Sequence, residues 1–242
     1  MNPILLIPAR MASTRLPGKP LADIGGVPMI VRVWRQAVLA GLGPVVVAAG
    51  EAEVAAAIRQ AGGQAVLTDP NLPSGSDRIW AALQAADPAG AHDVVVNLQG
   101  DLPALDPGAI RAVTAALAAS GADIATLAAP IDNDADRQNP AVVKAVCAWN
   151  ADETLGRALY FTRATAPTGP GTLWHHVGLY AYRRAALARF VALPPSPLEQ
   201  REKLEQLRAL EAGLHIAVAR VDAPPLSVDT PDDLERARKH LS

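Results

Sequence analysis

The sequence predicts an α/β protein with a mostly parallel central sheet and helices on both of its faces. Short runs of consecutive apolar residues, typical of strands that are buried on both faces, alternate through the first half of the chain with helical patterns about ten residues long. The chain has 242 residues, half of them apolar. This length allows one sizeable α/β domain.

The first half supplies four strands and four helices in alternation. The expected strands are Ile4–Ile7, Val45–Val47, Gln64–Leu67 and Asp93–Leu98. The expected helices are Met29–Ala40, Glu51–Ala61, Ser76–Ala86 with Ser74 or Ser76 as its cap, and a helix that opens at Asp106-Pro107 and runs to Ala119.

The pattern changes after Ala125, where strands follow one another with few long helices between them. These expected strands are Ala125–Ala129, Val142–Trp149, Ala158–Phe161 and Val177–Tyr182. They predict a small antiparallel region that forms either a lobe over the site or a dimer surface. The chain then returns to helix at Leu198–Ala212, strand at Ile216–Val221 and a last helix from Pro231.

Composition excludes several classes of protein. The formal charge of −2 argues against nucleic-acid binding, which requires a net basic face. No apolar run reaches the ~18 residues that cross a bilayer, and no signal peptide is evident, so we expect a cytoplasmic protein without membrane contact. The single cysteine, Cys147, excludes an intramolecular disulfide and a cysteine-rich metal site, and we expect it to be a buried core residue.

A basic loop follows the first strand. Arg10, Arg15 and Lys19 fall within ten residues, with hydroxyls at Ser13 and Thr14. The carboxyl end of a parallel strand is where open α/β sheets bind ligands, and cations with free backbone N–H groups suit a polyphosphate. The chain has neither GxGxxG after this strand nor GxxxxGK[ST], so it contains neither a dinucleotide-binding fingerprint nor a Walker loop. The alternative is a solvated surface loop that happens to be basic.

Two aspartates, Asp101 and Asp229, are candidate ligands for a metal ion. Asp101 comes just after the fourth strand, where Gly100 lets the backbone turn, and Asp229 comes just before Thr230, the expected cap of the last helix. Mg²⁺ favours one or two protein carboxylates together with phosphate oxygens and water. The competing interpretations are a turn residue for Asp101 and a second helix cap for Asp229.

Nearly the whole chain carries distinctive short motifs. They are Pro8-Ala-Arg…Ser-Thr-Arg-Leu-Pro-Gly-Lys-Pro-Leu21, Ser74-Gly-Ser-Asp-Arg78, Gln99-Gly-Asp101, Asn139-Pro140, Leu159-Tyr-Phe-Thr-Arg163, His176-Val-Gly-Leu-Tyr180, Pro195-Ser-Pro-Leu-Glu199, Leu204-Glu-Gln-Leu-Arg208 and Val228-Asp-Thr-Pro231. Taken together, these motifs resemble the 3-deoxy-manno-octulosonate cytidylyltransferases, the CMP-Kdo synthetases. The first motif also suits sialic acid cytidylyltransferases, whereas the His-x-Gly-x-Tyr and Glu-Gln-Leu-Arg segments favour the Kdo branch.

The resemblance implies a single Rossmann-like nucleotidyltransferase domain over residues 1–242. Residues 1–130 would form its nucleotide-binding half, residues 131–182 a sugar-binding and dimer-forming region, and residues 183–242 a return to the main sheet. The enzyme would join CTP and 3-deoxy-D-manno-octulosonate (Kdo) into CMP-Kdo, release pyrophosphate and serve lipopolysaccharide biosynthesis as a homodimer.

The resemblance also implies roles for individual residues. The nucleotide would be bound by Arg10, Ser13, Arg15, Lys19, Ser74, Gly75 and Arg78, and Mg²⁺ by Asp101 and Asp229. Catalysis would depend on Lys19, Arg10, Asp101 and Asp229. The sugar pocket would be lined by Gln99, Arg163, His176, Tyr180, Glu205 and Gln206.

Several competing interpretations stay open. His176 could be a polar residue with purely structural bonds, and Glu205 a solvated charge on its helix. Leu102, Gly50 and Pro73 depart from the family pattern. They remove no proposed phosphate or metal group, but they leave room for a related ulosonic acid, either sialic acid or amino-Kdo, as the substrate. The chain could also be a nucleotidyltransferase that makes a diphosphocytidyl polyol, or a nucleotide-binding regulatory domain without turnover.

Overall fold

The computed structural model describes residues 1–13 and 15–241 and divides into two compact units. Thr14, whose hydroxyl the sequence adds to the basic loop, lies outside the described residues. The first unit is Met1–Arg111 together with the segment from Pro225, and the second is Ala112–Pro224. Whether the chain acts as one domain with the functional divisions given above remains a prediction.

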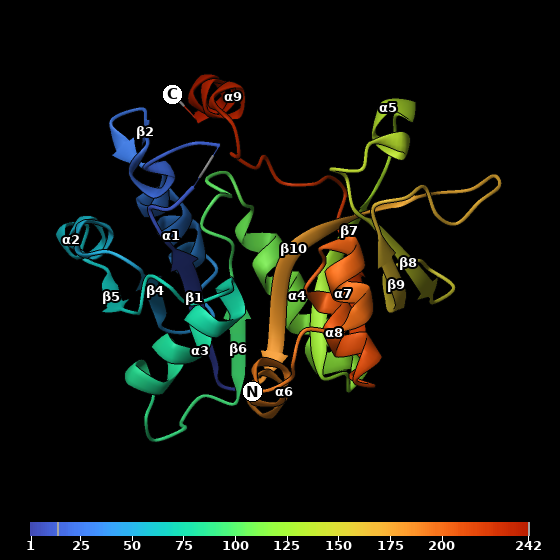
Figure 1. The fold of residues 1–242 in the computed structure, drawn as a ribbon, viewed down its shortest axis with the longest axis horizontal. Coiled ribbons are helices and arrows are strands. Elements are labelled where there is room, and N and C mark those ends of the chain that lie inside the picture. The colour runs from blue at the N-terminus through green and yellow to red at the C-terminus, as the bar shows by residue number, and fades with distance from the viewer. Residues whose placement is uncertain (14, 242) are drawn as a thin grey trace. The chain divides into compact units, whose positions relative to one another are not determined.

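The first unit contains a parallel sheet (Figure 1). Its strands run in the order β5 (Gln64–Leu67), β4 (Val45–Ala49), β1 (Pro3–Ala9) and β6 (Val94–Asn97). The helices of this unit are η1 (Lys19–Leu21), α1 (Met29–Leu39), α2 (Ala52–Gln60), α3 (Gly75–Ala86) and α9 (Pro231–Leu241), and α4 (Pro107–Ser120) starts here and ends in the second unit. These elements confirm the alternation predicted for the first half, with ends that differ by a few residues.

The strand order determines where a ligand can bind. From β1 the chain moves outward through β4 to β5 and then returns, by α3, to β6 on the other side of β1. Since such crossovers are right-handed, the reversal puts α3 on the face opposite α1 and α2. The direction of winding therefore changes between β1 and β6, and open α/β sheets bind ligands beyond the carboxyl ends of the strands at such a point.

A small hairpin and the last helix complete the first unit. The hairpin, β2 (Asp23–Ile24) with β3 (Val27–Pro28), was not predicted. Ile24, Met29, Val228 and Leu234 form a buried cluster that joins the hairpin, α1 and α9, and Leu16 of the basic loop packs against it. This packing holds the basic loop next to the segment that carries Asp229.

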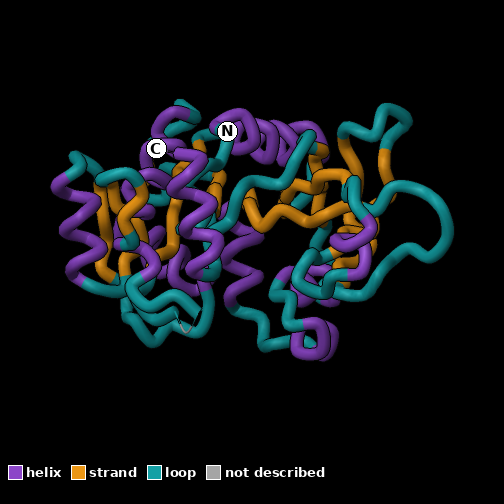
Figure 2. The backbone as a smooth tube through the Cα atoms, turned by 90° about the horizontal axis from the view of Figure 1, so that it is seen from above, coloured by secondary structure: helices purple, strands orange, loops and turns teal. Residues whose placement is uncertain are grey.

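The second unit contains a mixed sheet, visible with its helices in Figures 1 and 2. Its strands run in the order β10 (Trp174–Arg183), β7 (Ile124–Pro130), β11 (Ile216–Arg220), β9 (Leu155–Thr162) and β8 (Lys144–Trp149). β7 and β11 are parallel and the other pairs are antiparallel. A single pairing of Lys144 with His175 also joins β8 to β10. The helices are α5 (Asp134–Gln138), α6 (Arg184–Val191), α7 (Pro197–Glu202) and α8 (Gln206–Glu211).

The prediction of one helix over Leu198–Ala212 is wrong, because this segment forms α7 and α8 with a break between them. Lys203 lies at the break in the left-handed conformation, with φ of 58°. Arg163 donates to the carbonyls of Glu202, at 2.8 Å, and of Lys203, at 3.4 Å. Arg163 is 39 and 40 residues away from these two acceptors in the sequence, so no pattern within the segment itself could predict the bonds. The short helices α5 and α6 were not predicted either.

Two smaller expectations can also be compared with the structure. Cys147 is only partly buried rather than a fully buried core residue, and burial raises the pKa of its thiol to about 12. Such a thiol remains protonated at neutral pH and is a poor nucleophile. None of the helices in residues 1–13 and 15–241 has both the length and the apolar character needed to cross a bilayer.

Candidate functional site

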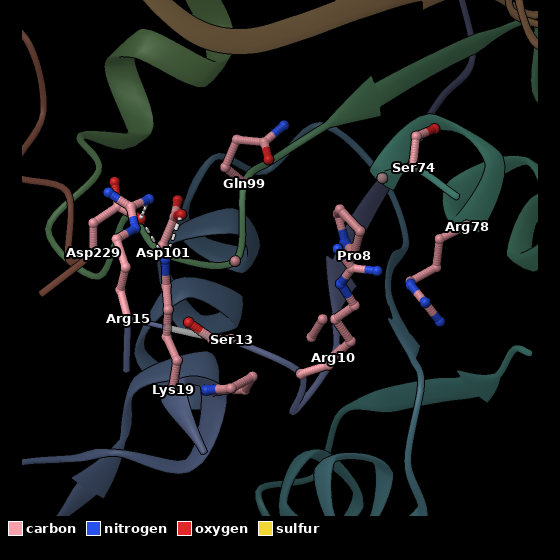
Figure 3. A pocket seen from close by; sticks show the side chains of 15 residues that line it. Pro8, Arg10, Ser13, Arg15, Lys19, Ser74, Arg78, Gln99, Asp101 and Asp229 are labelled. Carbon is pink, nitrogen blue, oxygen red and sulfur yellow. Dashed lines mark hydrogen bonds and ion pairs between the residues drawn. The ribbon is translucent and has the colours of Figure 1, made fainter. Parts of the chain in front are cut away.

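A cavity of about 430 Å³ lies in the first unit, at the carboxyl ends of β1 and β6. Its lining includes all the residues that the sequence assigned to nucleotide or metal, and Gln99 of the sugar set as well. They are Arg10, Ser13, Arg15, Lys19, Ser74, Gly75, Arg78, Gln99, Asp101 and Asp229. Residues far apart in the sequence therefore meet around one space, as Figure 3 shows.

Lys19 lies between the two aspartates. Its Nζ is 2.8 Å from an oxygen of Asp101 and 3.0 Å from an oxygen of Asp229, and Arg15 also contacts Asp229, at 3.0 Å (Figure 3). Burial tends to lower the pKa of Lys19, but the two carboxylates outweigh it and raise the pKa above its ordinary value. Lys19 is therefore a cation at neutral pH. Two carboxylates that converge on one cationic atom are a donor arrangement that also suits Mg²⁺.

Backbone contacts explain why Asp101 and Asp229 meet. The N–H of Val228 donates to the carbonyl of Asp101, at 3.0 Å. The next residue, Asp229, is not used as a helix cap, because Thr230 and Asp233 cap α9 by bonding to each other's side chain and backbone. The predicted cap is confirmed, and the Asp229 carboxylate remains available to Lys19 and Arg15.

The other side of the cavity is formed by Arg10, Arg78 and the start of α3 (Figure 3). Ser74 caps α3: its hydroxyl accepts from the N–H of Asp77 and donates to the Asp77 carboxylate. The N-terminus of a helix favours anions, since its first N–H groups lack partners within the helix. This side of the cavity therefore offers the guanidinium of Arg10, the positive charge of Arg78 and a helix N-terminus to an anionic ligand.

Arg78 is almost completely buried, with 2% of its surface exposed. Its guanidinium donates to the hydroxyl of Thr68 and to the carbonyls of Asp69 and Pro70, at 2.7 to 3.1 Å. Burial and, after it, the nearby charge of Arg10 lower the pKa of Arg78. Arg78 thus fixes the segment after β5 and adds positive charge to the cavity wall.

Sequence reasoning missed Glu51, which holds the basic loop. Its carboxylate accepts from the backbone N–H of Met11, at 2.8 Å. The signal in the sequence is weak, because an acidic residue just before a helix is common for reasons of helix stability alone. Ser13 also has a role within the loop, where its hydroxyl accepts from the N–H of Leu16 at 3.3 Å.

Gly100 permits a close approach of the two strand ends. A Cβ at this position would lie 2.8 Å from the carbonyl oxygen of Pro8 and 3.4 Å from a methyl carbon of Ile30. Gly100→Ala should therefore lower the free energy of unfolding by about 1 to 3 kcal/mol, as overpacking usually does. Urea denaturation measures it. Gly75→Ala is the matched control, because its Cβ would meet Pro8 at an ordinary 3.6 Å; equal midpoints for the two variants would contradict the prediction.

The five remaining sugar residues lie in the second unit: Arg163, His176, Tyr180, Glu205 and Gln206. The rings of His176 and Tyr180 have centroids 5.6 Å apart. Burial and then the charge of Tyr182 and Glu205 raise the pKa of Tyr180, so its hydroxyl stays protonated at neutral pH. Arg163 bonds to backbone carbonyls, at Pro140 as well as at the helix break.

Gln206 is buried, with 7% of its surface exposed. Its amide nitrogen Nε2 has no hydrogen-bond partner among the described residues. A buried donor without an acceptor is destabilising. A ligand hydroxyl or carboxylate would satisfy it.

The sequence matches a known family model and is similar to several named proteins. Residues 4–216 match the family model described as cytidylyltransferase. The chain is 67% identical over 241 residues to the 3-deoxy-manno-octulosonate cytidylyltransferase of Parvibaculum lavamentivorans, covering 100% of this chain and 93% of that protein. It is 65% identical to the protein of the same name from Rhodospirillum rubrum, covering 99% and 95%.

A solved structure agrees over the full length. It is a CMP:2-keto-3-deoxy-manno-octonic acid synthetase in complex with CTP, with 37% sequence identity and a TM-score of 0.91. The match covers 100% of this chain and 98% of that one.

Proposed function

The chain belongs to the cytidylyltransferase family, and we infer that it activates Kdo with CTP to give CMP-Kdo and pyrophosphate. The observation that carries this function is the cavity at the ends of β1 and β6, where four cationic side chains and two carboxylates face one space. Such a set suits the triphosphate of a nucleotide with its metal ion. The activated sugar would serve lipopolysaccharide biosynthesis.

In the proposed reaction the anomeric hydroxyl of Kdo attacks the α-phosphorus of CTP. A bond forms between this oxygen and phosphorus, and the hydroxyl proton passes to solvent water. The bond from the α-phosphorus to the oxygen that bridges to the β-phosphate breaks, and pyrophosphate leaves with that oxygen. Because little covalent chemistry is asked of the protein, catalysis depends on alignment and on stabilisation of charge on the phosphoryl oxygens. We assign this stabilisation to Lys19, Arg15 and Arg10.

Nucleotide binding would also involve Ser13, Ser74, Gly75 and Arg78. The N-terminus of α3, which Ser74 caps, lines the cavity and offers backbone N–H groups. Arg78, whose guanidinium is committed to Thr68, Asp69 and Pro70, would act through its charge and through the loop that it holds.

Asp101 and Asp229 are the proposed ligands of Mg²⁺. Their oxygens already share one cation, the Nζ of Lys19, so the pair fits an ion that takes two carboxylates and leaves its other positions to phosphate and water. When bound, Mg²⁺ would supply positive charge to the phosphate oxygens. Lys19 would then be free to turn from the carboxylates to a phosphate.

The sugar would be bound by Gln99, Arg163, His176, Tyr180, Glu205 and Gln206. A polyol needs both donors and acceptors, and neutral His176, protonated Tyr180 and the unpaired amide nitrogen of Gln206 provide them. Arg163 is proposed to face the carboxylate of Kdo, and its present bonds to backbone carbonyls keep its side chain in one orientation.

Incubation with CTP and Kdo, with pyrophosphate release as the readout, tests the function directly. A panel that includes N-acetylneuraminate, amino-Kdo and the other nucleoside triphosphates tests its specificity. We expect turnover with CTP and Kdo. Turnover of N-acetylneuraminate but not Kdo would overturn the branch assignment, and nucleotide binding without pyrophosphate release would favour a regulatory domain.

We also propose that the chain forms a homodimer through residues 131–182 and that the Rossmann-like description applies to the whole fold. In this region Leu159 of β9 is half exposed, an apolar side chain that a partner could cover. A monomeric mass at micromolar concentration would refute the dimer.

A further inference from the structure

Strand β10, which carries His176, has an irregular pairing with β7 just after this histidine. Val177 of β10 pairs with Leu127 of β7, but Ala181 pairs with Ala125, so β10 has two more residues than β7 between these pairs. A bulge of this kind leaves backbone groups without their partners in the ladder and redirects side chains. Figure 1 shows the two strands, β7 and β10.

Thr126 lies opposite the bulge and supplies the missing partner. Its side chain is fully buried, and its Oγ1 is 3.1 Å from the carbonyl oxygen of Val177 and 2.9 Å from that of Leu179. The same Oγ1 is 3.0 Å from Nε2 of His176. One hydroxyl therefore joins the bulged backbone to the histidine ring.

These three contacts determine which ring nitrogen carries the proton. The hydroxyl has one proton, and two of its neighbours are carbonyl oxygens that can only accept. If the hydroxyl donated to Nε2, its oxygen lone pairs would face both carbonyls without a proton between them. The hydroxyl must then donate to the carbonyls, and Nε2 must be the N–H that donates to Oγ1.

The surroundings keep the ring neutral and in place. Burial, and after it the charge of His175, lowers the pKa of His176 to about 3. Phe161 packs edge-on against the ring with centroids 4.8 Å apart, and the backbone N–H of His176 donates to the carbonyl of Val143, at 2.8 Å. In a neutral ring with its proton on Nε2, Nδ1 is an acceptor.

We propose that Thr126 is a positioning residue that holds His176 as the Nε2-protonated tautomer, so that Nδ1 accepts a hydrogen bond from a hydroxyl of the sugar substrate. This inference rests on the proposed function, in which His176 lines the sugar pocket. Thr126 itself is buried in the sheet and acts on the substrate only through the ring and the bulge.

The test combines kinetics with the spectrum of the ring. Thr126→Val keeps the shape and removes the hydroxyl, and it should raise KM for Kdo about three- to tenfold, the worth of one hydrogen bond, with KM for CTP unchanged. Thr126→Ser, which keeps the hydroxyl, should restore KM for Kdo. Thr114→Val, at a buried threonine of α4 outside the proposed nucleotide, metal and sugar sets, is the matched control and should leave both KM values unchanged.

Ring ¹⁵N chemical shifts report the tautomer without reference to activity. The His176 signals, identified by their loss in His176→Gln, should show protonated Nε2 and unprotonated Nδ1 in the wild-type chain. A ring protonated on Nδ1 would overturn the inference. This measurement, repeated on Thr126→Ser, decides the tautomer even if Thr126→Val does not fold.

His176→Gln separates the inference from the function on which it rests. If this variant raises KM for Kdo but Thr126→Val does not, His176 binds the sugar and the role of Thr126 is refuted. If neither variant changes KM for Kdo, the assignment of His176 to the sugar pocket is wrong and the inference fails with it. In the expected case, Thr126→Val adds nothing to the effect of His176→Gln in the double variant.

Discussion

Lys19→Met should lower kcat by about 10²- to 10³-fold, the usual effect of removing one group that stabilises charge in the transition state. Lys19 is the cation that lies between Asp101 and Asp229 in the cavity, and only 14% of its side chain is exposed. Methionine keeps most of the volume of the side chain and removes the charge. Steady-state kinetics at saturating CTP and Kdo measures the effect.

Lys19 should also contribute to stability, because it is a largely buried cation between two carboxylates. Without Lys19 the two carboxylates face each other with only Arg15 nearby, so we expect Lys19→Met to lose about 1 to 2 kcal/mol of unfolding free energy. The loss stays small because 28% of the Asp101 side chain and 36% of the Asp229 side chain are exposed to solvent.

Lys239→Met, the same substitution in the exposed last turn of α9, is the matched control. It should change neither kcat nor the urea midpoint. If Lys19→Met retained a near-normal kcat while losing stability, Lys19 would be a structural partner of the aspartates and no part of the catalytic machinery.

Much of this site could be predicted because it depends on local sequence. The apolar run of β1 is followed at once by the cations, and Asp101 follows the run of β6, so parallel pairing of the two strands brings their ends together. The pairing of Thr230 with Asp233 could be read from their spacing, which left Asp229 available.

The features that sequence reasoning missed depend on contacts between distant segments. Three of these features are hydrogen bonds between residues that no periodicity or spacing in the sequence connects. They are the bond from Val228 to Asp101, the bond from Met11 to Glu51, and the bond from Arg163 to Glu202 next to the helix break. From the sequence, Thr126 is predicted to be an ordinary strand residue within an apolar run. Its hydroxyl becomes important only because β10 is bulged opposite it.

Asp101→Asn should raise the Mg²⁺ concentration needed for half-maximal activity by at least about tenfold, since the amide keeps the shape of the carboxylate but loses the charge that binds a hard cation. We expect a larger effect than for Asp229→Asn, because the Asp101 side chain is less exposed to solvent than that of Asp229. Initial rates over a Mg²⁺ titration measure it, and Mn²⁺ binding followed by electron paramagnetic resonance gives a readout independent of turnover.

Asp106→Asn, five residues further along the same loop, is the control for Asp101→Asn. Asp106 accepts from the N–H of Gly108, which an asparagine oxygen can also do, so metal dependence should not change. If Asp101→Asn bound Mn²⁺ as well as the wild-type chain and kept its activity at limiting Mg²⁺, Asp101 would not be a metal ligand. Its contact with Lys19 would then serve only to hold that cation in the cavity, and the proposed metal site would have to be abandoned.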